Sequence, residues 1–149
     1  MCRSQWYAPG SKEGIERLRN WVKKGTAWAM GMLAERYREG VGVKQSDTKT
    51  VELFKMAAKR GHARSQYNLG VYYRQGMSGV TQSSKKAFEY YKLAAEQGHA
   101  MAQYNVGVMY AQGEGIETSY SKARVWVTKA AAQGFKKAID VLKELDQHG

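Results

Sequence analysis

The sequence predicts an all-α fold, a solenoid built from helix-turn-helix repeats. The first observation is a set of glycines with spacings of 36, 37 and 36 residues, namely Gly25, Gly61, Gly98 and Gly134. The second is that small residues, tyrosines and further glycines follow each of them at a nearly constant distance. The third is that apolar residues between them recur with the 3.6-residue period of an α-helix. A repeat length between roughly 20 and 50 residues is typical of solenoids, in which each unit stacks on its neighbours.

The glycine positions divide the chain into six segments. These are a loose N-terminal tail (1–11), a half-repeat helix (12–24), repeat 1 (25–60), repeat 2 (61–97), repeat 3 (98–133) and a C-terminal capping helix (134–149). In the half-repeat, one helical face is expected to be buried, and it carries Ile15, Leu18, Trp21 and Val22. The last segment has the pattern of an amphipathic helix, which suits the end of a stack.

The first helix of each repeat is predicted to begin just after the repeat glycine, at about 27–38, 63–74 and 100–111. Four positions in each share one face and are expected to form the core: Met30, Leu33, Ala34 and Tyr37; Gln66, Leu69, Gly70 and Tyr73; Gln103, Val106, Gly107 and Tyr110. A glycine inside a helix costs up to about 1 kcal/mol relative to alanine. We therefore expect another helix to pack closely against Gly70 and Gly107.

The second helix of each repeat is predicted at about 47–60, 84–97 and 120–133. Ser46, Ser83 and Ser119 stand where these helices begin. A serine oxygen at that position can accept a hydrogen bond from a backbone N–H group that the helix leaves unpaired. In each second helix a bulky pair of residues precedes an alanine pair, which lets neighbouring helices interdigitate.

Composition indicates a protein that works inside the cell. The chain has 149 residues, with 24 Lys and Arg, 13 Asp and Glu, and a net charge of +11. Its single cysteine, Cys2, can form no internal disulfide, which argues against a disulfide-stabilised secreted scaffold. No apolar run approaches the roughly 18 residues needed to cross a bilayer, and the first residues lack the apolar segment of a signal peptide. We expect an intracellular, cytoplasmic protein.

The repeating residues resemble the Sel1-like repeat (SLR), a relative of the tetratricopeptide repeat (TPR) that is slightly longer and richer in glycine. The resemblance covers about Gly25 to Gly134, as three full units with half-units on either side. It depends on an Ala-x-Ala opening, a Leu-Gly step, a tyrosine, spaced glycines, and Lys-Ala before a closing Ala-Ala. Residues that carry these motifs include Ala27 and Ala29, Ala100 and Ala102, Leu69 and Gly70, Lys86 and Ala87, and Lys122 and Ala123. Serine replaces the usual aspartate of the family at the start of the second helix.

The resemblance implies a right-handed α/α superhelix whose first helices line a concave surface that holds partner proteins. It implies a non-enzymatic adaptor or scaffold, since members commonly serve in quality control, signalling or membrane-associated complexes. A disulfide-rich secreted branch, linked to penicillin binding, does not fit a chain with one cysteine. Some relatives carry the repeats after a zinc-binding RING module. An alternative is therefore a fragment of a RING-type ubiquitin ligase whose repeats recruit substrate, with Cys2 and Arg3 as its remnant.

Residues opposite the predicted core face are the candidate partner-binding residues, which we call the first-helix stripe. They are Trp28, Met32, Glu35, Arg64, Asn68, Val71, Met101, Asn105 and Val108. Methionine beside an aromatic anchor suits a peptide groove, because methionine adapts its shape to the partner. Arg64, with Arg38 and Arg74 on the flank, is a candidate for holding acidic side chains. The alternative is that neighbouring first helices cover part of the stripe.

A second candidate surface is basic, and we call it the basic rim. It consists of six cations expected on the second helices: Lys49, Lys55, Lys86, Lys92, Lys122 and Arg124. An excess of positive charge attracts nucleic acid and anionic membranes, so a basic-surface binder is the alternative function. Basic residues are dispersed along the chain without a long block, which favours a solvated surface.

The sequence contains no pattern that predicts catalysis, a cofactor or a metal site. Zinc, phosphate-loop, serine-nucleophile and paired-carboxylate motifs are absent. His62 and His99 recur directly after repeat glycines, but no Cys or carboxylate recurs at ligand spacing. We predict that both histidines cap helices or lie in loops. Glu114 and Glu117 fall in a predicted loop and are expected to be plain polar surface residues.

Overall fold

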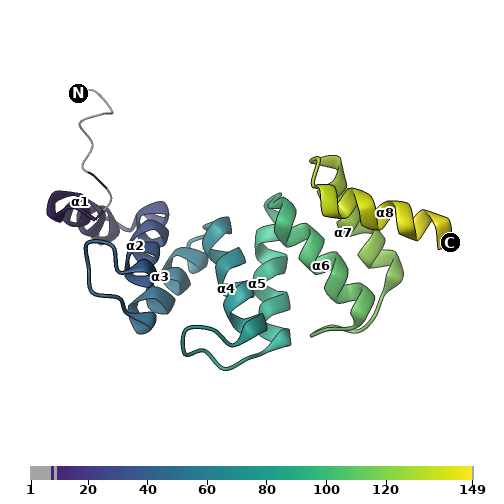
Figure 1. The fold of residues 1–149 in the computed structure, drawn as a ribbon, viewed down its shortest axis with the longest axis horizontal. Helices are drawn as coiled ribbons and strands as arrows, with labels where there is room; N and C mark the ends of the chain where they lie inside the picture. Colours follow the sequence, from purple (N-terminus) through teal and green to yellow (C-terminus); the bar gives the residue numbers. More distant parts are fainter. Residues whose placement is uncertain (1–7, 9, 149) are drawn as a thin grey trace. The chain divides into compact units, whose positions relative to one another are not determined.

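The computed structural model describes residues 8 and 10–148, and most of them are helical (Figure 1). Eight α-helices lie in this part of the chain: α1 Lys12–Lys23, α2 Ala27–Glu39, α3 Asp47–Lys59, α4 Ala63–Gln75, α5 Ser84–Glu96, α6 Ala100–Gln112, α7 Tyr120–Ala132 and α8 Lys136–His148. They form consecutive helix pairs, which confirms the predicted all-α solenoid class. Cys2, Arg3 and most of the predicted N-terminal tail lie outside the described residues.

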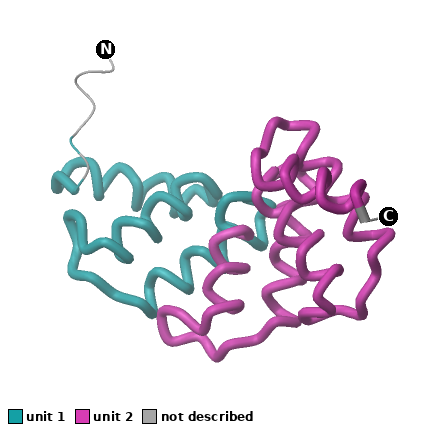
Figure 2. Tube along the Cα trace, turned by 45° about the vertical axis from the view of Figure 1, so that its right-hand side comes forward, with its two compact units in different colours: residues 1–65 teal, residues 66–149 magenta. Residues whose placement is uncertain are grey.

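The fold divides into two compact units between residues 65 and 66, inside α4 (Figure 2). Unit 1 contains α1, α2, α3 and the first turn of α4. Within it α1 packs on α2, and α2 packs on α3. Unit 2 contains the rest of α4 and the helices from α5 to α8. Within it α6 packs on both α5 and α7, and α7 packs on α8.

Short-range backbone chemistry sets where the helices begin and end. The Oγ atoms of Ser46, Ser83 and Ser119 accept hydrogen bonds from the backbone N–H three residues on, at 3.2, 3.2 and 3.3 Å. These donors belong to the first helical turn, which has no partner for them within the helix. The predicted serine caps are thus confirmed. Gly40 and Gly113 end α2 and α6 with φ values of 69° and 67°, a left-handed conformation that glycine adopts without steric cost.

The predicted core face of the first helices is buried. All twelve residues assigned to it, four each on α2, α4 and α6, are buried. A Cβ atom on Gly70 would lie 2.5 Å from Cδ1 of Tyr91 on α5, and one on Gly107 would lie 2.5 Å from Cγ2 of Val127 on α7. Each glycine therefore lets the second helix of its own repeat approach closely, which confirms the packing reason expected from the sequence.

Two predicted buried positions of α1 are wrong. Ile15 and Leu18 are 2% and 9% exposed, but Trp21 keeps 39% of its surface exposed and Val22 is only half-buried. The physical reason is that α1 packs mainly on α2, so a helix at the end of a stack is covered on one side only. Trp21 lies on the face of α1 that the sequence pattern predicts to be buried. In the structure this position is at the edge of the contact with α2.

Candidate partner-binding surface

The first-helix stripe lies at the surface of both units, and none of its nine residues is buried. Four of them are exposed, namely Trp28, Met32, Arg64 and Met101. The other five are half-buried, namely Glu35, Asn68, Val71, Asn105 and Val108. In unit 1 the stripe residues belong to α2 and the first turn of α4, and in unit 2 they belong to α4 and α6.

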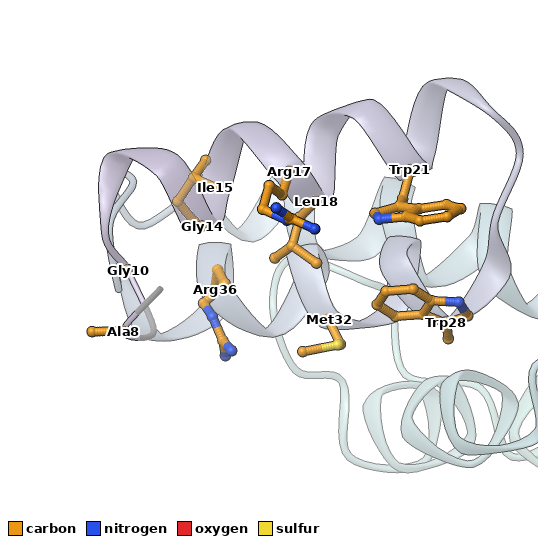
Figure 3. A pocket seen from close by; sticks show the side chains of 10 residues that line it. All are labelled: Ala8, Gly10, Gly14, Ile15, Arg17, Leu18, Trp21, Trp28, Met32 and Arg36. Carbon is orange, nitrogen blue, oxygen red and sulfur yellow. The ribbon is translucent and has the colours of Figure 1, made fainter. Parts of the chain in front are cut away.

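In unit 1, Trp28 and Met32 line a cleft between α1 and α2, which we call the α1–α2 cleft (Figure 3). Its volume is about 270 Å³. The lining residues are Ala8, Gly10, Gly14, Ile15, Arg17, Leu18, Trp21, Trp28, Met32 and Arg36. No acidic residue is among them. The cleft is therefore mainly apolar, and the charged groups in its lining are two arginines.

Trp21 and Trp28 form one end of the α1–α2 cleft. Their ring centroids lie 5.9 Å apart with the ring planes at 46°, and Nζ of Lys24 lies 5.0 Å from the centroid of the Trp21 ring. Trp21 is in the last turn of α1 and Trp28 in the first turn of α2. Sequence reasoning selected Trp28 but missed Trp21, Arg17 and Arg36. The available signal was the three-residue connection between α1 and α2, which brings these two turns side by side.

In unit 1, the arginines expected to hold acidic side chains of a partner already have carboxylate partners within the chain. Nη2 of Arg64 lies 2.9 Å from Oε1 of Glu35, so two residues of the stripe pair with each other. Nη2 of Arg38 lies 3.2 Å from Oε1 of Glu39, and this pair is largely exposed. Arg64 and Arg38 each lie at a carboxylate of the same chain, and their role in holding acidic side chains of a partner stays a prediction.

In unit 2, Arg74 forms a bidentate ion pair with Glu114. Nε and Nη2 of Arg74 each donate to one carboxylate oxygen at 2.9 Å, and donation to Glu114 raises the pKa of Arg74. Burial raises the pKa of Tyr91, whose side chain also interacts with Arg74, to about 12. The expectation that Glu114 is a plain polar surface residue is wrong, whereas Glu117 is exposed as expected.

In unit 2, two of the stripe residues on α6 are an exposed methionine and an asparagine whose side chain is hydrogen-bonded. Met101 is 44% exposed at the start of α6. Asn105, one turn further on, is hydrogen-bonded to Tyr67. Burial raises the pKa of Tyr67, and this hydrogen bond lowers it by a smaller amount. Met101 is therefore the large apolar side chain of α6 that is exposed rather than half-buried.

The lysines of the basic rim that recur in phase lie over tyrosine rings. Nζ of Lys49 is 5.1 Å from the Tyr37 ring centroid, and Lys86 and Lys122 are 5.3 and 5.7 Å from the rings of Tyr73 and Tyr110. A cation over an aromatic face is attracted by the ring quadrupole. In each repeat this contact joins the first helix to the start of the second.

The other three residues of the basic rim lie in different surroundings. Lys55 is exposed, whereas Lys92 and Arg124 are half-buried. Nη1 of Arg124 donates to Oδ1 of Asp146 on α8 at 2.6 Å. The rim is therefore a surface feature in which most of the cations contact groups of the same chain.

The two recurring histidines have structural contacts. Nδ1 of His99 accepts a hydrogen bond from the backbone N–H of Ala102 at 3.2 Å, so His99 caps α6 as predicted. Nδ1 of His62 lies 2.6 Å from Oγ of Ser65, and burial lowers the pKa of His62. Within residues 8 and 10–148, no three His, Cys, Asp or Glu side chains gather as metal ligands. Over the same residues, no helix has the length and apolar character needed to span a membrane.

The succession of helix pairs, the glycine-mediated approach of the second helix and the serine caps define an α-solenoid of the TPR type. The family model of the Sel1 repeat matches three consecutive segments, residues 29–62, 63–99 and 100–135. These segments make up most of the chain, so the protein belongs to the Sel1 repeat family. The Sel1 repeat solenoid is generally a protein-interaction module.

Solved structures agree with this assignment. A Sel1 repeat protein from Oxalobacter formigenes is 35% identical, with a TM-score of 0.85 over 87% of this chain and 97% of the other. A protective antigen of uropathogenic Escherichia coli strains that displays an SLR fold is 34% identical, with a TM-score of 0.76 over 80% of this chain and 26% of the antigen. Cysteine rich protein B of Helicobacter pylori, 20% identical with a TM-score of 0.65 over 89% of this chain and 98% of the other, shares the fold. No curated protein matches the sequence.

Proposed function

We propose that this chain is a non-enzymatic adaptor that binds a partner protein, or a peptide segment of one, through the first-helix stripe. The observation that carries the proposal is the surface position of Trp28, Met32 and Met101, which are 45%, 37% and 44% exposed. Trp28 in unit 1 and Met101 in unit 2 hold the same position within their repeats, and large apolar side chains that remain in contact with water mark interaction sites. The general role of Sel1 repeats as interaction modules supports the same function.

The binding free energy expected from covering these three side chains is large enough for a specific partner. Full burial of a methionine side chain contributes about 1.5–3 kcal/mol, so covering the half-exposed Met32 or Met101 is worth about 1 kcal/mol each. Trp28 adds a larger apolar surface, and its side chain loses little conformational entropy on binding, as is common for interface anchors. Together these anchors account for an affinity gain of about 100-fold, since a tenfold change corresponds to about 1.4 kcal/mol.

The test is selection of binders from a displayed library of random ten-residue peptides, followed by affinity measurements with purified chain. The alanine variants of Trp28, Met32 and Met101 each test the stripe. Tyr120 is the matched control, because it is a large side chain on a second helix and is 70% exposed. We expect Trp28→Ala to weaken binding about tenfold and Tyr120→Ala to change it less than twofold, with unchanged circular dichroism. Absence of binders, or binders indifferent to all three stripe variants, would refute the proposal.

The competing function is binding of nucleic acid or an anionic membrane by the basic rim. The net charge of +11 favours it. The positions of Lys49, Lys86 and Lys122 over tyrosine rings weigh against it, because these lysines have a role within each repeat. A fluorescent single-stranded RNA and anionic vesicles are the probes. Binding at 0.15 M salt that disappears on changing the three lysines to glutamate would establish the competing function, and its absence would exclude it.

We also propose that the protein acts in the cytoplasm. Support comes from cysteine usage, since a chain with Cys2 alone gains nothing from an oxidising compartment. Cell fractionation of the tagged full-length protein tests this location. Recovery in the soluble cytoplasmic fraction is expected, and recovery only in secreted or membrane fractions would contradict it.

A further inference from the structure

We propose that the α1–α2 cleft anchors a short peptide that carries a bulky apolar side chain and, about three residues away, a carboxylate. This inference rests on the proposed function, because Trp28 and Met32 belong both to the stripe and to the cleft. It adds the chemistry of the partner and brings in Trp21, Arg17 and Arg36, which the stripe does not contain.

The geometry of the cleft sets the length of its occupant. Trp28, Met32 and Arg36 follow one another at intervals of four residues on α2, so they form one row on the helix surface. Figure 3 shows the row beside α1, with the two tryptophans near one end and Arg36 toward the other. Eight residues of helix span about 12 Å at 1.5 Å per residue. An extended peptide advances about 3.3 Å per residue, so about four peptide residues cover the row.

The tryptophan end of the cleft suits a single aromatic or large aliphatic side chain. The rings of Trp21 and Trp28 are tilted against each other, and the two residues are 39% and 45% exposed. Aromatic groups pack favourably at centroid separations of about 4.5–7 Å, so a third ring can join this pair. The cleft volume of about 270 Å³ lies below the roughly 300–1,000 Å³ of small-molecule sites, which favours a peptide side chain over a cofactor.

The arginine end of the cleft suits a carboxylate. Arg17 and Arg36 line the cleft, and none of the described residues that line it is acidic. Among residues 8 and 10–148, no ion pair engages the Arg36 guanidinium. The glutamates nearest to it in sequence are paired with other arginines. A guanidinium holds a carboxylate by two parallel hydrogen bonds, and the net charge of +11 adds long-range attraction for an acidic segment.

A peptide carboxylate comes either from an acidic side chain or from the C-terminus of a chain, and three labelled octapeptides separate these sources. All contain phenylalanine followed by glycine and leucine. The first continues with two glutamates and has an amidated C-terminus. The second has two glutamines in their place. The third ends directly after the residue that follows leucine, with a free C-terminal carboxylate and no acidic side chain. Fluorescence anisotropy with the full-length chain measures binding of each.

The variants Trp28→Ala and Arg36→Gln test the two ends of the cleft. Lys59→Gln is the matched control for charge, because Lys59 is an exposed cation of α3 and does not line the cleft. We expect Trp28→Ala to weaken the acidic peptide about tenfold, Arg36→Gln to weaken it about tenfold, and Lys59→Gln to change it less than twofold. The glutamine peptide is expected to bind about tenfold more weakly and to be indifferent to Arg36→Gln.

The outcomes separate the two proposals. Tight binding of the third peptide that depends on Arg36 supports the inference with a chain terminus as the source. Equal binding of the first and second peptides, or no effect of Arg36→Gln on any peptide, overturns it. If library-selected peptides depend on Trp28 but not on Arg36 and carry no carboxylate, this inference fails while the proposed function stands. If no selected peptide depends on the stripe, the proposed function itself fails.

Discussion

Arg74 and Glu114 meet in a bidentate ion pair although 40 residues separate them in the chain. Arg74 lies in the last turn of α4, in repeat 2, and Glu114 lies in the loop after α6, in repeat 3. Both side chains are about three quarters covered, at 28% and 25% exposure. The pair therefore ties two successive repeats together within unit 2.

The first prediction concerns this ion pair. Glu114→Gln removes the carboxylate and one of its acceptor positions, and we expect the free energy of unfolding to fall by about 1–2 kcal/mol. Asp146→Asn makes the same chemical change in the exposed Arg124 pair and is expected to cost less than about 0.5 kcal/mol. Urea unfolding of both variants measures the difference. Equal losses would contradict a structural role for Glu114.

The second prediction concerns the close approach of α7 to α6. Gly107→Ala places a methyl group against Val127, and we expect a loss of about 1–3 kcal/mol, which exceeds the gain of up to about 1 kcal/mol in helix propensity. The double variant with Val127→Ala relieves the contact. It is expected to cost at least about 0.5 kcal/mol less than the sum of the single variants. Strict additivity in urea unfolding would show that the contact is unimportant.

The third prediction concerns the helix caps. Ser83→Ala removes the acceptor for the N–H of Lys86, and we expect a loss of about 1 kcal/mol in the free energy of unfolding. Ser83→Asp keeps an acceptor and adds a negative charge at a helix start whose first turn has no acidic residue. It is expected to equal or exceed the stability of the unchanged chain by up to about 1 kcal/mol. Thermal unfolding near neutral pH, where the aspartate is ionised, measures the stability of both variants. A loss of stability in Ser83→Asp would count against the cap.

The fourth prediction concerns alkaline pH. Tyr91 ionises at a pKa of about 12 in the folded chain, above its ordinary value of 10, because it is buried. The unfolded chain therefore loses this proton first, and the stabilising contribution is complete below pH 10 and is lost as the pH rises toward 12. The loss amounts to up to about 3 kcal/mol, at about 1.4 kcal/mol per pKa unit.

The control for the alkaline prediction is Tyr91→Phe, which has no phenol to ionise. Urea unfolding of both chains between pH 8 and pH 11 separates the contribution of Tyr91 from that of the other tyrosines. The difference in stability between the two chains is expected to shrink as the pH rises above 10. A constant difference over this range would show that burial of the Tyr91 phenol has no energetic consequence.

Local features of the fold were predictable from the sequence because their causes are local. The core face that contains Met30 and Leu33 follows from the 3.6-residue period, and the cap at Ser46 follows from the chemistry of a helix start. The close packing at Gly107 was predictable because glycine lowers helix stability, so its presence inside a helix indicates that another helix lies close to it. Each of these depends on residues within one helix or on a contact that the repeat pattern specifies.

Contacts at the edges of the helices were not predictable in the same way. Periodicity gives the direction of a side chain but not its depth, so Trp21 was assigned to the core although it lies at the margin of the α1 contact. The pairing of Arg74 with Glu114 depends on a loop conformation that no repeat position encodes. The cleft residue Arg36 was missed because its role appears only when α1 lies beside α2.

The measurement that tests the central claim most directly is a titration of the ¹⁵N-labelled chain with a library-selected peptide, followed through the indole N–H signals. Trp28, on the first-helix stripe, and Trp21, beside it, are predicted to shift together with peptide concentration. Trp126 on α7, half-buried beneath Lys129, is predicted to stay unchanged. A shift of Trp126 with Trp21 and Trp28 unmoved would place the partner on the second helices and contradict binding through the stripe.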